Sequence, residues 1–354
     1  MKMTLEQLAK KANLSIGTVS MALRDDPRVK DSTKRFVLEL SQRLNYIPSA
    51  LGRSLATQKT QILGLTITDI TNPFFTEVFK GVEDTAVKNG YSVILSNTEY
   101  DLKRETEILR IFLEGRVDGL VIDPVENNTD FAMLKQLKRM GIPFVLLRKL
   151  KGLEKEYDYV MADDKKGAII LTQHLINMGH RRIGYIGSTQ CGVTDHDRFL
   201  GYKQALAKAG MEFDAGLVTS HDSFSLSEGL KVGRGLLQVR KDIDAVVAFN
   251  DLLALGVMEA AYSLGLRVPE DLAVGGFDDI YISGLSPVSL TTIALPKYEL
   301  GSRATELLID KIEAKRSNRS AKTNQIVLEP KLVIRRSCGY KGDVVSPQEK
   351  EERR

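Results

Sequence analysis

The sequence predicts two kinds of structure in one chain: a small all-α headpiece, followed by an α/β body of two subdomains. Three short helical patterns within residues 1–60 predict the headpiece, and this segment holds 11 Lys and Arg against 5 Asp and Glu. From Gln61 onward, strand-like apolar runs alternate with amphipathic helical stretches in two successive sets, which predicts the body. A cationic head on a near-neutral body is typical of a nucleic-acid-binding module joined to another domain. A chance charge cluster on a solvated face is the alternative.

The first two predicted helices are separated by a tight turn. Thr4 and Gln7 form a capping box at the start of the first helix. The apolar face of that helix is Leu5, Leu8, Ala9 and Ala12. Asn13 suits the left-handed backbone that a tight turn needs, and Ser15 is the natural N-cap of a second helix, Ile16 to Leu23. Its inner face is predicted to be Val19, Ala22 and Leu23.

A third helix is predicted after Asp26-Pro27, starting at Asp31 or Ser32. Its inward residues would be Phe36, Val37, Leu40 and Leu44. Three short helices with a tight turn between the first two describe a helix-turn-helix, whose second helix enters the major groove of DNA. A helical hairpin with no role in DNA binding is the alternative, and the basic charge of the segment weakens it.

Length and composition exclude several classes of protein. The chain has 354 residues, of which 43% are hydrophobic and 27% charged, as in ordinary globular proteins. Apolar runs stay well short of the ~20 residues that span a membrane. The first residues, MKMTLEQLAKKANLS, lack the apolar core of a secretory signal, so we expect a cytoplasmic protein without a membrane partner. Cys191 and Cys338 are expected to be free thiols.

Residues 4–56 resemble the DNA-binding headpiece of the lactose-repressor (LacI/GalR) family. The resemblance rests on TLEQLAKKANLS, on SIGTVS in the second helix, and on NYIPSALGRSLA. It implies residues 1–47 as a headpiece that binds a palindromic DNA operator as a homodimer, followed by a hinge helix and linker at 48–60. Leu55 would insert into the minor groove, since an apolar wedge can unstack a base step; a plain linker leucine is the alternative.

The resemblance also assigns residues that contact DNA. Base edges would be read by Ile16, Gly17 and Met21, with help from Arg24 or Arg28. Hydroxyl groups at Ser15, Thr18 and Ser20 are better suited to phosphates. The complete predicted set is Thr4, Ser15, Ile16, Gly17, Thr18, Ser20, Met21, Arg24, Arg28, Ser49, Arg53, Leu55 and Ala56. Because Ile, Gly and Met cannot make bidentate hydrogen bonds to guanine or adenine, contacts to thymine methyl groups should dominate.

The body shows no catalytic or cofactor motif. No GxGxxG follows a candidate strand, and no GxxxxGKS phosphate loop is present. The histidines lack metal-ligand spacing, and no serine or Cys191 lies in a nucleophile-elbow pattern. His180 is better explained as a structural hydrogen-bonding residue before a strand. We therefore expect neither an enzyme nor a cofactor or metal, which disfavours a sugar-metabolising enzyme. A solute-binding protein would have no use for the headpiece.

The body resembles the periplasmic-binding-protein-like effector domain of the same family. Matching stretches include DITNPFFTEVFKGVEDTA, MGHRRIGYIG, DRFLGYKQAL, AVVAFNDLLALGVMEAA and LRVPEDLAVGGFDDI. The resemblance implies an effector-binding and dimerisation domain at 61–340, built from two Rossmann-like subdomains. The first would hold about 61–162 plus 290–324, and the second about 163–289 plus 325–340. The apolar face of the helix at Phe75–Lys88 is a candidate dimer interface, and residues 341–354 are expected to be a disordered tail.

The resemblance places a small-molecule effector in the cleft between the subdomains. The residues implied there are Phe74, Phe75, Asp123, Arg148, Arg198, Phe224, Asn250 and Asp278. For each phenylalanine, a place in the core is the alternative. Arg148 departs from the family, in which an acidic residue is common at this position. If it faces the cleft beside Arg198, it favours an effector with a phosphate or carboxylate; otherwise it belongs to a solvated basic loop. Whether the effector releases or tightens DNA binding is not set by the sequence.

Overall fold

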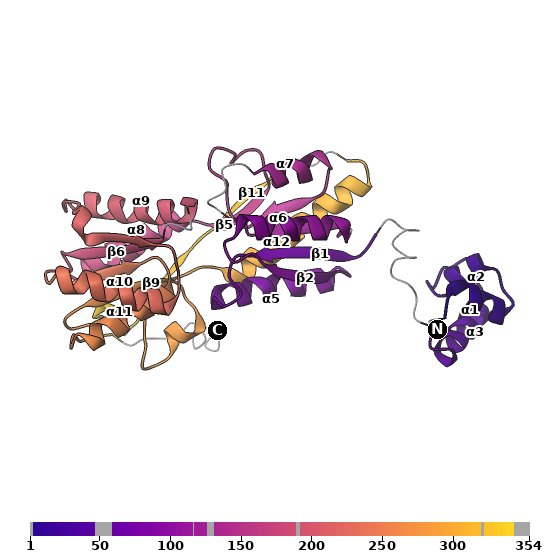
Figure 1. Ribbon diagram of the computed structural model, residues 1–354, viewed down its shortest axis with the longest axis horizontal. Helices are drawn as coiled ribbons and strands as arrows, with labels where there is room; N and C mark the ends of the chain where they lie inside the picture. Colours follow the sequence, from indigo (N-terminus) through magenta and orange to yellow (C-terminus); the bar gives the residue numbers. More distant parts are fainter. Residues whose placement is uncertain are drawn as a thin grey trace. The chain divides into compact units, whose positions relative to one another are not determined.

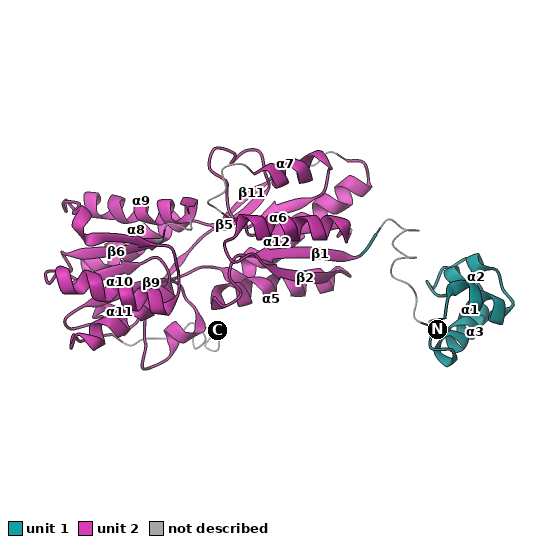
Figure 2. Ribbon diagram, viewed as in Figure 1, with its two compact units in different colours: residues 1–60 teal, residues 61–354 magenta. Residues whose placement is uncertain are grey.

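The computed structural model describes residues 3–46, 59–115, 117–125, 131–188, 192–319 and 322–342. The chain divides into two compact units, Met1–Thr60 and Gln61–Arg354 (Figure 2). The described part of unit 1 contains helices and no strand, and unit 2 contains two six-stranded sheets covered by helices (Figure 1). Among the described residues, no helix is both long enough and apolar enough to cross a membrane.

The described residues of unit 1 form α1 (Leu5–Ala12), α2 (Ile16–Ala22) and α3 (Asp31–Arg43). The predicted capping box is present, because the Gln7 N–H donates to Thr4 Oγ1 (3.2 Å) and the Thr4 N–H donates to Gln7 Oε1 (3.0 Å). Asn13 ends α1 in the left-handed conformation with φ 54°. The Thr18 N–H donates to Ser15 Oγ at 3.1 Å, so Ser15 caps α2. Residues close in sequence therefore determine where α1 ends and where α2 begins.

One residue that was predicted to face the core of unit 1 does not do so. Buried apolar side chains from the three helices and the α2–α3 loop form this core: Leu8, Ala9, Ala12, Val19, Ala22, Val29, Val37 and Leu40. Phe36, predicted to face inward, is 44% exposed. Val37, Leu40 and Ser41 take the inner face of α3, and a helical turn of 3.6 residues places the preceding position about 100° away. Leu44 is partly buried against the core, as predicted.

The first sheet of unit 2 is wholly parallel, with strand order β11-β5-β4-β3-β1-β2. Its strands are β1 (Ile62–Ile67), β2 (Ser92–Asn97), β3 (Gly119–Ile122), β4 (Phe144–Leu146), β5 (Tyr159–Ala162) and β11 (Gln325–Leu328). The accompanying helices are α5 (Pro73–Lys88), α6 (Leu102–Glu114), α7 (Ala132–Arg139) and α12 (Lys297–Arg316). Connected parallel strands need crossover helices, which explains the alternation in the sequence.

The second sheet has the order β12-β10-β9-β8-β6-β7 and is parallel except for β12. Its strands are β6 (Ile183–Ser188), β7 (Val218–His221), β8 (Ala245–Ala248), β9 (Ala273–Asp278), β10 (Thr291–Ala294) and β12 (Lys331–Val333). Its helices are α8 (Asp164–Asn177), α9 (Gly192–Lys208), α10 (Leu226–Val239) and α11 (Asp251–Ser263). Short 3₁₀ helices lie at Ala215–Leu217, Tyr281–Gly284 and Arg336–Cys338.

Two predicted subdomain boundaries are wrong. β10 pairs with β9 in the second sheet, although residues from 290 were assigned to the first subdomain. β11 pairs with β5 in the first sheet, although residues from 325 were assigned to the second. The chain therefore returns to the first subdomain only after β10, where Pro296 caps α12, and leaves it again between Leu328 and Lys331. Which sheet β10 or β11 joins depends on pairing partners that are distant in the sequence. The four residues of each strand do not determine that choice.

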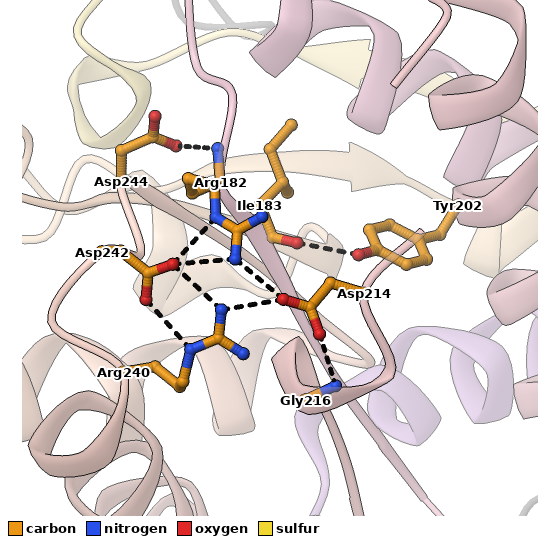
Figure 3. A network of polar contacts seen from close by, with 8 residues as sticks. All are labelled: Arg182, Ile183, Tyr202, Asp214, Gly216, Arg240, Asp242 and Asp244. Atoms are coloured by element: carbon orange, nitrogen blue, oxygen red, sulfur yellow. Dashed lines mark hydrogen bonds and ion pairs between the residues drawn. The ribbon is translucent and has the colours of Figure 1, made fainter. Parts of the chain in front are cut away.

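Charged side chains form a network of ion pairs at the edge of the second sheet where its parallel strands begin (Figure 3). The guanidinium groups of Arg182 and Arg240 each contact both Asp214 and Asp242, with N···O distances of 2.8–2.9 Å. Hydrogen bonds from Arg240, from the Gly216 N–H and from Arg182 lower the pKa of Asp214 to about 2. Acids and bases alternate in this cluster, so its charges are balanced.

Most of the apolar face of α5, which the sequence offered as a candidate dimer interface, is covered by the chain itself, so the place of the dimer interface stays a prediction. α5 packs its buried residues, which include Phe75, Val78 and Val82, against the sheet and α12. Gly81 and Gly301 lie at the crossing of the two helices. A Cβ on Gly81 would lie 2.1 Å from the Tyr298 carbonyl oxygen, so glycine is required for this close approach.

We expect Gly81→Ala to destabilise the body by about 2–4 kcal/mol, because the added methyl group meets backbone and the two helices must separate. Gly235→Ala is the matched control, since a Cβ there has no neighbour within 4 Å. Its helix should gain roughly 0.5–1 kcal/mol. Denaturant unfolding followed by circular dichroism measures both. Equal midpoints for the two variants would contradict the close crossing.

Candidate functional site

All eight side chains predicted to contact an effector line one cavity in unit 2. The cavity has about 660 Å³ of empty space, including space continuous with solvent. Both sheets contribute, because Asp123 and Arg148 follow β3 and β4, whereas Asn250 and Asp278 stand at the ends of β8 and β9. The carboxyl ends of parallel strands are where α/β proteins hold ligands. Its mixed polar and aromatic lining suits a small molecule.

Arg198 is the most constrained polar group of the cavity. Its Nε donates to Asp164 Oδ1 at 2.8 Å, and a second guanidinium nitrogen lies 2.8 Å from the same oxygen. The third contacts the carbonyl oxygen of Phe249. The guanidinium carbon lies 3.9 Å from the centre of the Phe277 ring, and the side chain is 5% exposed. Packing and hydrogen bonds therefore fix the Arg198 fork before any ligand arrives.

Asp278 and Asn250 stand beside Arg198. Asp278 Oδ1 lies 3.7 Å from the Arg198 guanidinium, and its backbone has a positive φ of 111° at the end of β9. Burial raises the pKa of Asp278 to about 8, against the opposing effect of Arg198. Asn250 Oδ1 accepts from the Leu253 N–H at 2.9 Å and caps α11. Its amide nitrogen carries two further donors.

Arg148 faces the cavity, which resolves the alternative left by the sequence. Its Nε donates to Asp123 Oδ1 at 2.7 Å, and a second nitrogen contacts the same oxygen. Thr68 Oγ1 donates to the other Asp123 oxygen at 2.7 Å. Arg148 also donates to Thr194 Oγ1 on α9 at 3.3 Å, so it bridges the two subdomains. Its charge is thus matched by a fully buried carboxylate.

The phenylalanines belong to the hydrophobic cores and also line the cavity, which the sequence had offered as alternatives. Phe75 and Phe224 are each 4% exposed and belong to the hydrophobic cores, yet both line the cavity. Phe224 lies 4.9 Å from the Tyr100 ring and 5.2 Å from the Phe249 ring, between centroids. Phe74 is half-buried and meets Phe75 edge-on at 5.1 Å.

Sequence reasoning missed several residues of this site. Asp164, which holds Arg198, follows a buried strand at its carboxyl end, the same signal that identified Asp123. Thr194 and Tyr100 carry no signal of this kind, because one lies in α9 and the other in a loop after β2. The remaining lining residues that were not predicted are Asn72, Leu147, Met161, Ala162, Phe249, Leu295 and Leu300.

Six of the predicted DNA-contacting residues lie at the N-cap of α2 or within α2: Ser15, Ile16, Gly17, Thr18, Ser20 and Met21. Ser15, Ile16 and Gly17 are exposed, and Ile16 is 49% exposed despite being apolar. Thr18, Ser20 and Met21 are half-buried. The Thr4 side chain is engaged in the capping box, Arg24 Nε donates to the Ser20 carbonyl oxygen at 3.1 Å, and Arg28 forms a bidentate pair with Asp26. Ser49, Arg53, Leu55 and Ala56 lie outside the described residues.

A helix-turn-helix module, joined to a two-sheet body with a cavity lined by polar and aromatic side chains from both sheets, defines a DNA-binding transcriptional regulator. Comparisons with known proteins agree. A family model described as bacterial regulatory proteins, lacI family, matches residues 4–49, and a model of the periplasmic binding protein-like domain matches residues 172–338. The chain is 35% identical over 332 residues to the ribose operon repressor of Halalkalibacterium halodurans, covering 94% of this chain and 96% of that protein.

The chain belongs to the lacI family of bacterial regulatory proteins. Among solved structures, it is similar to a complex of the transcriptional regulator CelR with cellobiose, at 30% identity and a TM-score of 0.72, over 95% of this chain and 100% of that one. The Lac repressor dimer bound to operator and the anti-inducer ONPF shares the fold, with a TM-score of 0.83 at 22% identity over 96% and 99% of the two chains.

Proposed function

We propose that this regulator is a repressor that binds a palindromic operator as a homodimer and responds to an uncharged, hydroxyl-rich effector in the cavity of unit 2. It would act in the cytoplasm, without catalysis, and dimerise through a surface other than the covered face of α5. The convergence of eight predicted side chains on one cavity carries the proposal. An effector changes DNA affinity only by binding two subdomain arrangements differently, and a cavity lined from both sheets allows this.

The charges in the cavity favour a neutral effector over an acidic one. Arg148 is paired with Asp123 and Arg198 with Asp164, so each guanidinium charge is already balanced by a neighbouring carboxylate. A phosphate or carboxylate would have to lie beside these carboxylates. Sugar hydroxyl groups donate and accept at once, so they can hydrogen-bond to an arginine and to its acidic partner together.

A panel of ligands tests this proposal. We expect neutral mono- and disaccharides to include ligands that raise the midpoint of thermal unfolding, and their phosphate and acid derivatives to raise it less at equal concentration. Isothermal titration calorimetry then gives the dissociation constants. Preferential binding of a sugar phosphate or sugar acid, lost in Arg148→Ala, would overturn the neutral assignment.

An ion pair between the two subdomains, formed by residues that do not line the cavity, should tune effector affinity. Lys149 Nζ lies 2.5 Å from Asp197 Oδ2, and the two residues belong to opposite subdomains. Because this half-buried pair stabilises the present arrangement of the two subdomains, Lys149→Ala should weaken the binding of an effector that is held by both of them, roughly fivefold or about 1 kcal/mol. Lys151→Ala is the matched control, since this neighbouring lysine is exposed and no carboxylate of the described residues is paired with it. Equal dissociation constants for the two variants would exclude this role.

A further inference from the structure

A basic groove lies at one edge of the first subdomain of unit 2. It runs between the carboxyl-terminal ends of α7 and α12, and its two cavities share Lys138, Glu156 and Tyr157, so they form one continuous depression. The larger has about 1320 Å³ of empty space, including space open to solvent. Its cationic side chains are Lys135, Lys138, Arg139, Lys311, Lys315 and Arg319. The helical portion of α7 has no acidic residue.

Four of these cations are unbalanced. Lys138 lies 3.8 Å from Glu156, and Lys311 lies 2.7 Å from Asp158. In the described part of the chain, no carboxylate pairs with the four others, Lys135, Arg139, Lys315 and Arg319, which are all exposed. The cluster in Figure 3 differs, because each arginine there meets two carboxylates.

The helix macrodipole explains only part of this arrangement. Cations are favoured in the last turn of any helix, by roughly 0.3–1 kcal/mol each. That effect places Lys138 and Arg139 at the end of α7, and Lys315 and Arg316 at the end of α12. The macrodipole does not explain why the basic carboxyl-terminal ends of α7 and α12 lie next to each other. Lys315 Nζ would lie 3.9 Å from a Cβ on Gly141, just beyond α7, so the two basic ends form one surface.

The groove adjoins the point where the chain enters unit 2. The Asp118 carboxylate accepts from the Gln61 N–H at 3.1 Å and from Arg316 at 2.7 Å, so the first residue of unit 2 and the end of α12 share one acid. Figure 1 shows the end of α12 and the start of β1 at the same edge of unit 2. Tyr46 ends the described helical module, and 15 residues later the chain is at Gln61, a tether of at most about 50 Å.

We propose that this basic groove, defined by Lys135, Arg139, Lys315 and Arg319, binds the phosphate backbone of DNA flanking the operator. The inference rests on the proposed function. If unit 1 binds the operator, DNA is held by a module that is connected to this edge of unit 2 through the segment ending at Gln61. Unpaired cations spread over two helix ends match the charge and extent of a DNA backbone, and phosphate contacts need no particular base sequence. The groove would add affinity and salt dependence without altering operator specificity.

The test uses the full-length protein and an operator duplex obtained by selection from random sequences. One duplex is trimmed to the operator, and the other extends it by about 20 base pairs on each side, two helical turns. We expect the extended duplex to bind more tightly in wild type. Lys315→Glu/Arg319→Glu should bind the extended duplex at least tenfold less tightly. The slope of log affinity against log salt should fall by roughly 3–4, because each subunit of the proposed homodimer loses two phosphate contacts.

Lys208→Glu/Arg234→Glu is the matched control, one lysine and one arginine on exposed positions of α9 and α10. It changes the net charge equally and should keep the wild-type slope. Equal affinity of wild type for the two duplexes, or equal slopes for both double variants, overturns the inference. Failure of wild type to bind any duplex would instead contradict the proposed function itself.

Discussion

Replacement of Arg198 by lysine should abolish the response to effector while leaving the protein folded. Lysine keeps the positive charge beside Asp164, so no buried carboxylate is left unpaired. It cannot reproduce the planar fork that contacts Asp164 and the Phe249 carbonyl, nor the stacking on Phe277. We expect the dissociation constant of the effector to rise at least about 100-fold, close to 3 kcal/mol, measured by calorimetry.

Two variants separate a binding defect from unfolding. Arg198→Ala leaves Asp164 buried without its partner, and should cost about 3–5 kcal/mol of folding free energy. Arg234→Lys makes the same conservative change on the exposed surface of α10, and should alter neither stability nor effector binding. If Arg198→Lys bound the effector within a few-fold of wild type, the cavity around Arg198 would not be the effector site.

Replacement of Ile16 by aspartate should abolish DNA binding without unfolding the headpiece. Ile16 is the first residue of α2 and is 49% exposed, so it contributes little to the core. An acidic residue in the first turn of a helix is favoured by the macrodipole, so headpiece stability should be kept or slightly raised. On DNA, the carboxylate would face the phosphate and base-edge acceptors of the major groove.

We expect Ile16→Asp to weaken operator binding at least about 100-fold in fluorescence anisotropy, through repulsion of the duplex and loss of an apolar contact. Leu38→Asp supplies the matched control, because Leu38 is a similarly exposed apolar residue (45%) on α3. Its operator affinity should remain within a few-fold of wild type. Tight operator binding by Ile16→Asp would show that α2 does not enter the major groove.

The parts of this structure that follow from sequence are those governed by neighbouring residues. The capping box at Thr4, the left-handed Asn13 and the cap at Ser15 depend only on residues within one helical turn. The alternation of apolar strands and amphipathic helices predicted an α/β body, because each strand or helix is recognised from the apolar pattern of its own residues. Phe36 was misplaced because two adjacent apolar residues, Phe36 and Val37, leave the helical phase ambiguous.

The features that escaped prediction depend on contacts between distant segments. The membership of β10 and β11 is decided by their partners β9 and β5, and the apolar face of α5 is covered by α12, more than 200 residues later. In the cavity, the positions of eight side chains followed from the family resemblance. The pairing of Arg148 with Asp123, 25 residues apart, did not, and it reverses the charge argument for the effector.

The central claim is that a ligand in the cavity of unit 2 changes the affinity of the protein for operator DNA. Its most direct test is an operator titration by fluorescence anisotropy, with and without saturating effector, for wild type and Arg198→Lys. We expect the dissociation constant of wild type to change at least about tenfold with effector, about 1.4 kcal/mol of coupling. Arg198→Lys should match wild type without effector and show no change with it. An effector that binds wild type without shifting its operator affinity would contradict the claim.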